Sequence, residues 1–138
     1  MRQLFVDTSA WDALADSGDA NHELALLFRN EIAGRCRLVV TNYVLDELYT
    51  LLLMNVGYNC AVDFKRKLDA LVHERVVQVV WVAEEIATEA WAVFEQFNVD
   101  KEWSFTDCVS YVVMKRRTIT EVFAFDHHFA QMGFVCHP

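Results

Sequence analysis

The chain has 138 residues and a formal net charge of −8 at pH 7, and 54% of its residues are hydrophobic. This length suits a single domain over residues 1–138, and the apolar content is high enough for a core, which excludes long disordered stretches. The excess of acids has the wrong sign for tight, non-specific nucleic-acid binding. A nucleic-acid function would therefore need a local basic surface, metal ions that neutralise acids, or a second subunit.

The cysteines and the apolar runs bear on the cellular compartment of the protein. The four cysteines form no C-x-x-C pair, which argues against a zinc site or a redox motif; they are Cys36, Cys60, Cys108 and Cys136. No apolar run is long enough for the core of a signal peptide or for a membrane span. We expect a cytoplasmic protein with buried, reduced thiols and no membrane contact.

Apolar runs typical of buried strands alternate with helical patterns along the chain. In chain order we expect a strand at 4–6, helices near Trp11 and at 22–32, a strand at 37–41, helices at 42–55 and 61–72, a strand at 76–80, helices at 86–94 and 108–115, a strand at 121–125, a short helix through Phe129 and a strand at 134–136. Residues 98–103 are expected to form a loop. This alternation predicts βαβ units and a mainly parallel sheet that is covered on both faces.

Four acids are placed to meet at one edge of this sheet. Asp7 and Asp126 directly follow predicted strands, and Glu47 lies in the first turns of the helix that follows another strand. Asp107 opens a helix whose N-terminus should face the same edge. Because ligands of open parallel sheets bind beyond the carboxyl ends of the strands, we expect all four carboxylates there.

Four converging carboxylates repel one another unless a cation or protons compensate them. Hard oxygen ligands suit Mg²⁺ or Mn²⁺, which leave coordination positions open for water and phosphate oxygens. Such a site meets the requirements of phosphodiester hydrolysis.

Each acid alone also has a structural explanation. Three of the four could be part of helix caps: Asp7, Asp107 and Asp126. Asp107 lies three residues after Ser104, which is the spacing of a capping box. Glu47 could be an exposed helix acid, as could its neighbour Asp46. The joint placement of the four at one edge favours the metal site.

Four segments, in this order, resemble the motifs of PIN-domain ribonucleases, in particular the VapC-like toxins. They are residues 5–11 (FVDTSAW), 44–48 (VLDEL), 104–110 (SFTDCVS) and 124–129 (AFDHHF), the last followed by QMGF at 131–134. The resemblance covers essentially the whole chain.

This resemblance implies an α/β/α sandwich with a Mg²⁺- or Mn²⁺-dependent site that cleaves RNA. The acidic quartet of the family would correspond to Asp7, Glu47, Asp107 and Asp126, assisted by a polar residue from among Thr8, Ser9 and Thr106. VapC-like members usually form homodimers and are silenced by a cognate antitoxin, so both partners are expected here.

Basic and aromatic residues offer further candidates. RNA contacts are possible for Lys115, Arg116 and Arg117. Cations at a helix C-terminus also interact favourably with the helix dipole, which would explain them without RNA. His127 stands where the family often has a basic arginine. We expect a surface or substrate role for His127 and His128 rather than metal ligation. Core and interface positions are expected for the tryptophans at 11, 81, 91 and 103.

The leading hypothesis is a metal-dependent endoribonuclease, the toxin of a toxin–antitoxin pair. The alternative is a non-catalytic PIN-like module that binds a protein partner. Other phosphotransfer folds fit less well. A haloacid-dehalogenase-like phosphatase needs a second Asp where Ser9 stands, and a receiver domain needs adjacent acids after the first strand, where only Asp7 is present.

Overall fold

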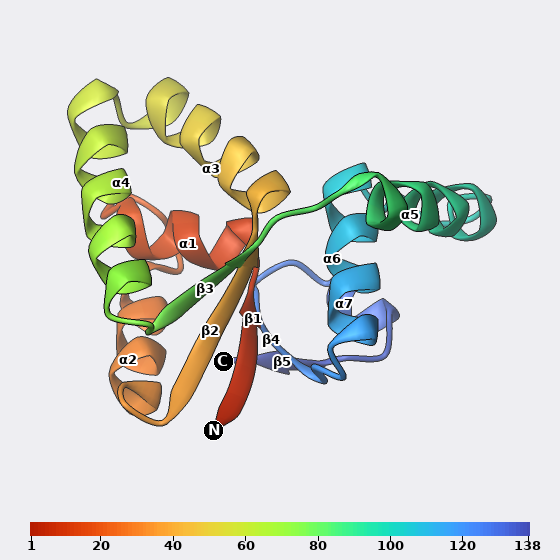
Figure 1. Ribbon diagram of the computed structural model, residues 1–138. Coiled ribbons are helices and arrows are strands. Elements are labelled where there is room, and N and C mark those ends of the chain that lie inside the picture. The colour runs from red at the N-terminus through yellow and green to blue at the C-terminus, as the bar shows by residue number, and fades with distance from the viewer.

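A computed structural model describes residues 1–138 as five strands and seven helices (Figure 1). The strands are β1 (Arg2–Val6), β2 (Cys36–Thr41), β3 (Val77–Val80), β4 (Glu121–Phe123) and β5 (Val135–His137). The helices are α1 (Thr8–Ala15), α2 (His22–Ile32), α3 (Asn42–Asn55), α4 (Tyr58–His73), α5 (Glu84–Phe97), α6 (Phe105–Arg116) and α7 (His128–Gln131).

All strand pairs are parallel, and their order in the sheet is β3-β2-β1-β4-β5. From β1 to β3 the chain adds strands on one side of β1. It then crosses back through α5 and α6 and places β4 on the other side. The chain therefore reverses direction across the sheet between β1 and β4, and such a switch point opens a crevice at the carboxyl edge.

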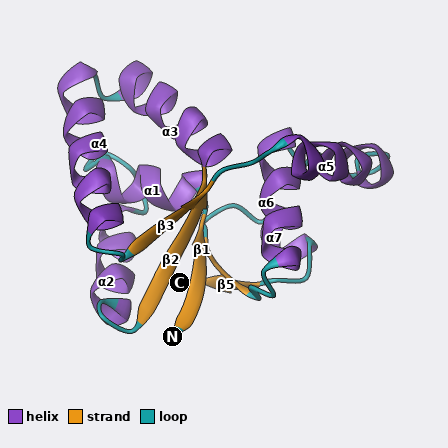
Figure 2. Ribbon diagram, viewed as in Figure 1, coloured by secondary structure: helices purple, strands orange, loops and turns teal.

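The helices form a layer on each face of the sheet, which confirms the predicted α/β/α sandwich. Helices α1 to α4 lie on one side and α5 to α7 on the other (Figure 2). The central strand β1 is covered on both faces, and its residues Leu4, Phe5 and Val6 have no exposed surface. These residues belong to a continuous core of 31 buried residues. Burial on both faces explains why the strand sequences read as apolar runs instead of alternating ones.

Most predicted elements are confirmed, with shifted ends. The prediction of a strand over 121–125 is wrong at its end, because β4 stops at Phe123. Beyond that point the backbone N–H of Phe125 donates to the Ser9 hydroxyl at 3.0 Å and not to a neighbouring strand. Helix α6 begins at Phe105, three residues before the predicted start, because Ser104 caps it. The chain also turns between Asp16 and Asn21, a second loop that the sequence did not indicate.

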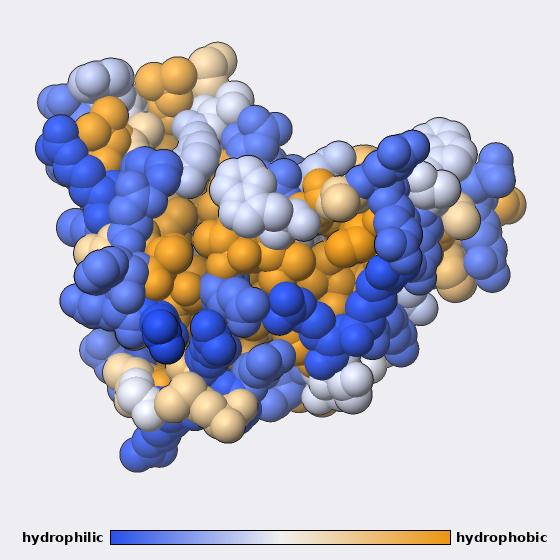
Figure 3. All heavy atoms as spheres, viewed as in Figure 1, coloured by the Kyte–Doolittle hydropathy of each residue, from blue (hydrophilic) through white to orange (hydrophobic).

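The expectation that all the thiols are buried needs correction. Only Cys36 and Cys108 are buried; Cys60 and Cys136 are partly exposed, and all four are free thiols. Among the tryptophans, Trp11 and Trp103 are in the core, whereas Trp81 and Trp91 have 75% and 54% of their surface exposed. Figure 3 shows apolar residues gathered in a hollow between the α3–α4 side and α5, bordered by polar residues. No helix is long and apolar enough to cross a membrane.

The core position of Phe5 gives a test of this arrangement. Replacement of Phe5 by Ala leaves a cavity in the middle of the sheet, so we expect it to lower the free energy of unfolding by about 3–5 kcal/mol. Urea denaturation followed by circular dichroism measures the change. The matched control is Leu27→Ala on α2, where the side chain is 62% exposed and the expected change is within about 0.5 kcal/mol. Equal effects of the two substitutions would contradict the placement of β1.

Candidate active site

Asp7 occupies the carboxyl end of the central strand and is the N-cap of α1. Its Oδ2 accepts hydrogen bonds from the Ser9 hydroxyl at 2.8 Å and from the Ser9 backbone N–H at 3.3 Å. Its own N–H donates to the carbonyl of Phe123 at 3.0 Å, which fixes it to the end of β4. Only 3% of Asp7 is exposed. The cap interpretation is therefore right for Asp7, and it places the carboxylate at the switch point between β1 and β4.

Asp107 reaches the same edge from the other helical layer. It is the third residue of α6, and its N–H donates to the capping hydroxyl of Ser104 at 3.0 Å. Its carboxylate is not used for that cap. Oδ2 instead lies 2.7 Å from Nδ1 of His128, and 6% of the residue is exposed.

Asp126 lies in the loop between β4 and α7, on the other side of the switch point from Asp7. Its Oδ1 accepts the backbone N–H of His128 at 2.8 Å, so the carboxylate also stabilises the turn into α7. The same oxygen lies 3.2 Å from Nδ1 of His128. Its side chain is 30% exposed, which leaves it open to solvent and to a ligand.

Glu47 lies in the second turn of α3, a helix that Thr41 caps by accepting the N–H of Val44 at 3.2 Å. Glu47 is half-buried, whereas its neighbour Asp46 is exposed. The pKa of the Glu47 carboxyl is raised, mainly by burial, and the nearby hydroxyls of Thr8 and Thr106 oppose this shift. Of the two adjacent acids, Glu47 is therefore the one that faces the other carboxylates.

The four carboxyl groups influence one another electrostatically. Burial first, and then the charge of Asp107, raise the pKa of Asp7 to about 7. The charges of Asp107 and Asp126 also raise the pKa of Glu47. The pKa of Asp107 is raised by burial and by Asp126, against the hydrogen bond from His128. The structure thus brings Asp7, Glu47, Asp107 and Asp126 to one edge, where each ionised group disfavours the next.

The donor set fits a hard divalent cation. No lysine or arginine forms an ion pair with any of the four acids, and the Thr8 hydroxyl is buried without a hydrogen-bond partner. The only three potential ligands whose donor atoms all lie within 4.8 Å of one another are Asp126, His127 and His128. The oxygens of the four carboxylates are thus farther apart than the ligands of a site in which the protein alone surrounds the ion. This spacing suits Mg²⁺, which keeps several waters and binds few carboxylates directly.

The assisting polar residues have distinct places. Ser9 connects Asp7 to the loop that carries Asp126, since its hydroxyl donates to Asp7 and accepts the N–H of Phe125. Thr8 and Thr106 lie near Glu47, and their hydroxyls oppose the rise in its pKa. Ser9 is therefore a structural partner of the acids, whereas Thr8 and Thr106 present hydroxyls beside them.

The basic candidates lie away from the acids, with one exception. Lys115, Arg116 and Arg117 are at the C-terminal end of α6, roughly 12–15 Å along the helix from Asp107 at 1.5 Å per residue. Arg116 forms ion pairs with Glu85 and Glu89 on α5. His127, with a 78% exposed side chain, is the candidate beside Asp126.

The role of His128 was not predicted. We expected a surface or substrate residue, but its side chain is only 19% exposed and contacts two of the four acids. The available signal was the pair of adjacent histidines after Asp126. Neighbouring residues at the start of a helix point in different directions, so one of the two could face the acids while the other faces solvent.

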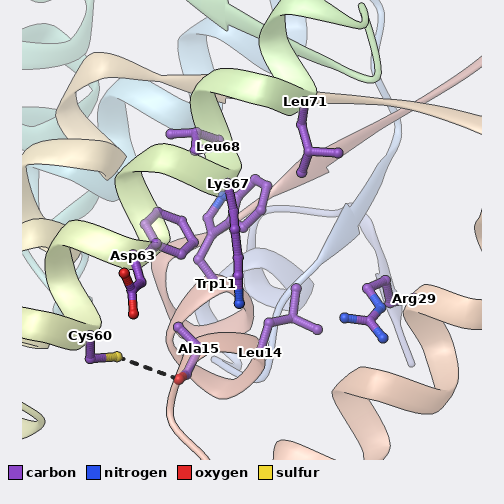
Figure 4. Close-up of a pocket in the computed structure, with 10 residues that line it drawn as sticks. Trp11, Leu14, Ala15, Arg29, Cys60, Asp63, Lys67, Leu68 and Leu71 are labelled. Atoms are coloured by element: carbon purple, nitrogen blue, oxygen red, sulfur yellow. Dashed lines mark hydrogen bonds between the residues drawn. The ribbon is translucent and has the colours of Figure 1, made fainter.

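A cleft lies elsewhere on the protein, away from the four acids. It has a volume of about 470 Å³ and opens between α1, α2 and α4 (Figure 4). Its lining includes Trp11, Leu71 and the cations Arg29 and Lys67. Cys60 donates its thiol hydrogen to the Ala15 carbonyl on its wall, at 3.7 Å. None of the four acids lines this cleft.

Comparisons with known proteins agree with this fold. The PIN domain family profile matches residues 4–135. The chain is 36% identical over 133 residues to the 23S rRNA-specific endonuclease VapC20 of Mycobacterium tuberculosis, covering 96% of this chain and 95% of VapC20. It is 25% identical over 127 residues to a VapC ribonuclease of Archaeoglobus fulgidus, covering 91% of this chain and 78% of that protein.

Solved structures give the same result. The crystal structure of M. tuberculosis VapC20, described as a sarcin–ricin loop cleaving toxin, superposes with a TM-score of 0.82 at 34% identity and covers 96% of each chain. The VapBC2 structure of Rickettsia felis bound to promoter DNA gives a TM-score of 0.69 at 9% identity, over 98% of this chain and 97% of that one, and shows the shared fold alone. With its fold, its order of motifs and its similarity over nearly the full length, the chain belongs to the PIN-domain family and, within it, to the VapC group.

Proposed function

We propose that the protein is a divalent-metal-dependent endoribonuclease that hydrolyses RNA phosphodiester bonds and acts as the toxin of a toxin–antitoxin pair. The observation that carries this proposal is the set of four acids at the switch point, none of them paired with a lysine or arginine. A scaffold that only binds a partner has no need for carboxylates that repel one another. A hydrolase that binds a cation needs such carboxylates as ligands.

In this proposal Asp7, Asp107 and Asp126 hold the cation, directly or through water. When bound, Mg²⁺ or Mn²⁺ would polarise the phosphodiester and stabilise the developing charge. Glu47 orients the attacking water and accepts its proton, a role that suits a half-buried carboxyl with a raised pKa. Attack at phosphorus with departure of the 3′ oxygen leaves a 5′-phosphate end.

The substrate and the partners follow from the family. The relative named as specific for 23S rRNA makes 23S rRNA the first substrate to test, and the cytoplasm is then the expected site of action. We further propose a homodimer and a cognate antitoxin. The apolar hollow of Figure 3 is consistent with a covered surface, as is the exposure of Trp81 and Trp91. His127 is the proposed RNA contact nearest the acids.

Replacement of Asp7 by Asn tests the assignment of the acids. We expect RNA cleavage in Mg²⁺ or Mn²⁺ to fall at least about 100-fold, because the lost charge stabilisation is worth several kcal/mol. The measurement is the rate of cleavage of an end-labelled 23S rRNA fragment, with analysis of the product ends. Glu47→Gln should have an effect of the same order.

The matched control is Asp46→Asn, which removes the same charge from the adjacent exposed position. We expect its cleavage rate to stay within about twofold of wild type, as for surface changes away from a site. Wild-type cleavage by the Asp7 variant would show that the quartet is assigned incorrectly. Activity of the wild-type protein in EDTA would exclude a metal requirement.

The raised pKa of Asp7 predicts how stability depends on pH without metal. Asp7 binds its proton more tightly in the folded state, with a pKa of about 7, than in the unfolded state, where it is about 3.9. Its contribution is complete below the unfolded value and is lost as the pH rises from about 4 to about 7. Thermal denaturation in EDTA should therefore show falling stability over this range.

Asp7→Asn should flatten that dependence and stabilise the metal-free protein at pH 8, by up to roughly 4 kcal/mol. Addition of Mg²⁺ should stabilise the wild type at pH 8 much more than the variant. If both proteins had the same pH profile in EDTA, the Asp7 carboxylate would not be destabilised by burial.

A further inference from the structure

We propose that His128 is a positioning residue that holds Asp107 and Asp126 in place for cation binding, by donating from Nδ1 to Asp107 and from its backbone N–H to Asp126, and that it is not a metal ligand. This inference rests on the proposed function, since it concerns the same carboxylate site. It adds to the four acids a fifth residue with a role different from theirs.

The contacts of His128 are concentrated on the two acids. Nδ1 lies 2.7 Å from Oδ2 of Asp107 and 3.2 Å from Oδ1 of Asp126. The backbone N–H of His128 also donates to Oδ1 of Asp126, at 2.8 Å. An ionised carboxylate only accepts hydrogen bonds, so the tautomer that fits these contacts carries its proton on Nδ1. A protonated Nδ1 cannot coordinate a metal, and Nε2, the other ring nitrogen, points away from the two acids that Nδ1 faces.

This contact joins two separate parts of the chain at the carboxyl edge of the sheet. Asp107 is on α6, whereas Asp126 is in the loop after β4, and the two acids raise each other's energy by repulsion. His128 is the only side chain with a nitrogen within 4.0 Å of both. His127 is mostly exposed and lies 3.9 Å from Asp126 alone. One histidine therefore contacts both acids, of which one lies on a helix and the other in a loop.

These contacts leave the acids free to bind. Each carboxylate has two oxygens with about four acceptor positions, and His128 occupies one oxygen of each. Oδ1 of Asp107 and Oδ2 of Asp126 have no hydrogen-bond partner in the protein. Groups that hold metal-binding carboxylates in this way contribute strongly, and their loss typically costs 10–100-fold in metal affinity or activity.

Titration of Mn²⁺ into metal-free protein by calorimetry tests the inference with four proteins. We expect His128→Ala to weaken Mn²⁺ binding by about 10–100-fold. His128→Asn should stay within about threefold of wild type, because its amide nitrogen is the same number of bonds from Cα as Nδ1 and can donate in its place. His73→Ala, the matched control, removes an exposed histidine of α4 and should bind Mn²⁺ within about twofold of wild type.

Pulsed EPR of the bound Mn²⁺ separates positioning from ligation. We expect no coupling from a directly bound imidazole nitrogen in the wild type. Wild-type affinity in a folded His128→Ala protein would overturn the inference. So would a directly coupled nitrogen that disappears in both His128 variants, which would make His128 a ligand. Circular dichroism and thermal melting show whether each variant is folded. If His128→Ala does not fold, the Mn²⁺ affinity of His128→Asn and the EPR spectrum of the wild type still distinguish positioning from ligation.

The outcomes also separate this inference from the proposed function. If the wild type and the variants follow the expected order of Mn²⁺ affinity but the wild type cleaves no RNA, the positioning role stands and the nuclease proposal falls. If the wild type binds no Mn²⁺, both fall. If the wild type cleaves RNA in Mn²⁺ and His128→Ala matches it in both affinity and rate, only the positioning role falls.

Discussion

Repulsion among carboxylates that the fold itself buries is the constraint on which this site depends. The sheet order places the ends of β1 and β4 side by side, and the N-terminus of α6 and the second turn of α3 close on the same edge. Burial removes water from Asp7 and raises its pKa to about 7. No lysine or arginine is paired with these acids, so no such side chain offsets their mutual repulsion when they ionise. The cation site that we propose at this edge would supply the missing positive charge.

The same constraint explains why the bulk charge was a poor guide to function. An excess of acids argues against non-specific RNA binding, and the basic residues of α6 are partly taken up by Glu85 and Glu89. An enzyme that reaches phosphate through a bound cation does not need a basic face of its own at the reacting bond. The exposed side chains of His127 and Trp81 are free to make further contacts to RNA or to a second subunit.

Much of the fold was predictable because its strands are buried on both faces. Runs such as residues 4–6 can only be central strands if helices cover both sides, and the alternation then gives the parallel sheet. The ends of elements were less predictable. The end of β4 depends on a hydrogen bond from Phe125 to Ser9, which lies 116 residues away in sequence. Contacts of this kind carry no local signal.

The positions of the acids were predictable for a similar reason. A residue that follows a parallel strand lies at the carboxyl edge, so chain order alone brought Asp7 and Asp126 together. A role in a helix cap does not exclude a role in the site. Asp7 and Asp126 each use one oxygen for a cap or turn, and this contact keeps the carboxylate at the edge of the sheet. His128 was missed because its direction is set by the first turn of α7, which spacing alone does not give.

A crystal structure of the protein soaked in Mn²⁺, with anomalous difference maps, tests the central claim most directly. The account predicts an anomalous peak at the carboxyl edge of the sheet, in contact with at least two of Asp7, Asp107 and Asp126, directly or through one water. An ion that is bound by His127 and His128 away from these carboxylates, or no ion at this edge at saturating Mn²⁺, would contradict it.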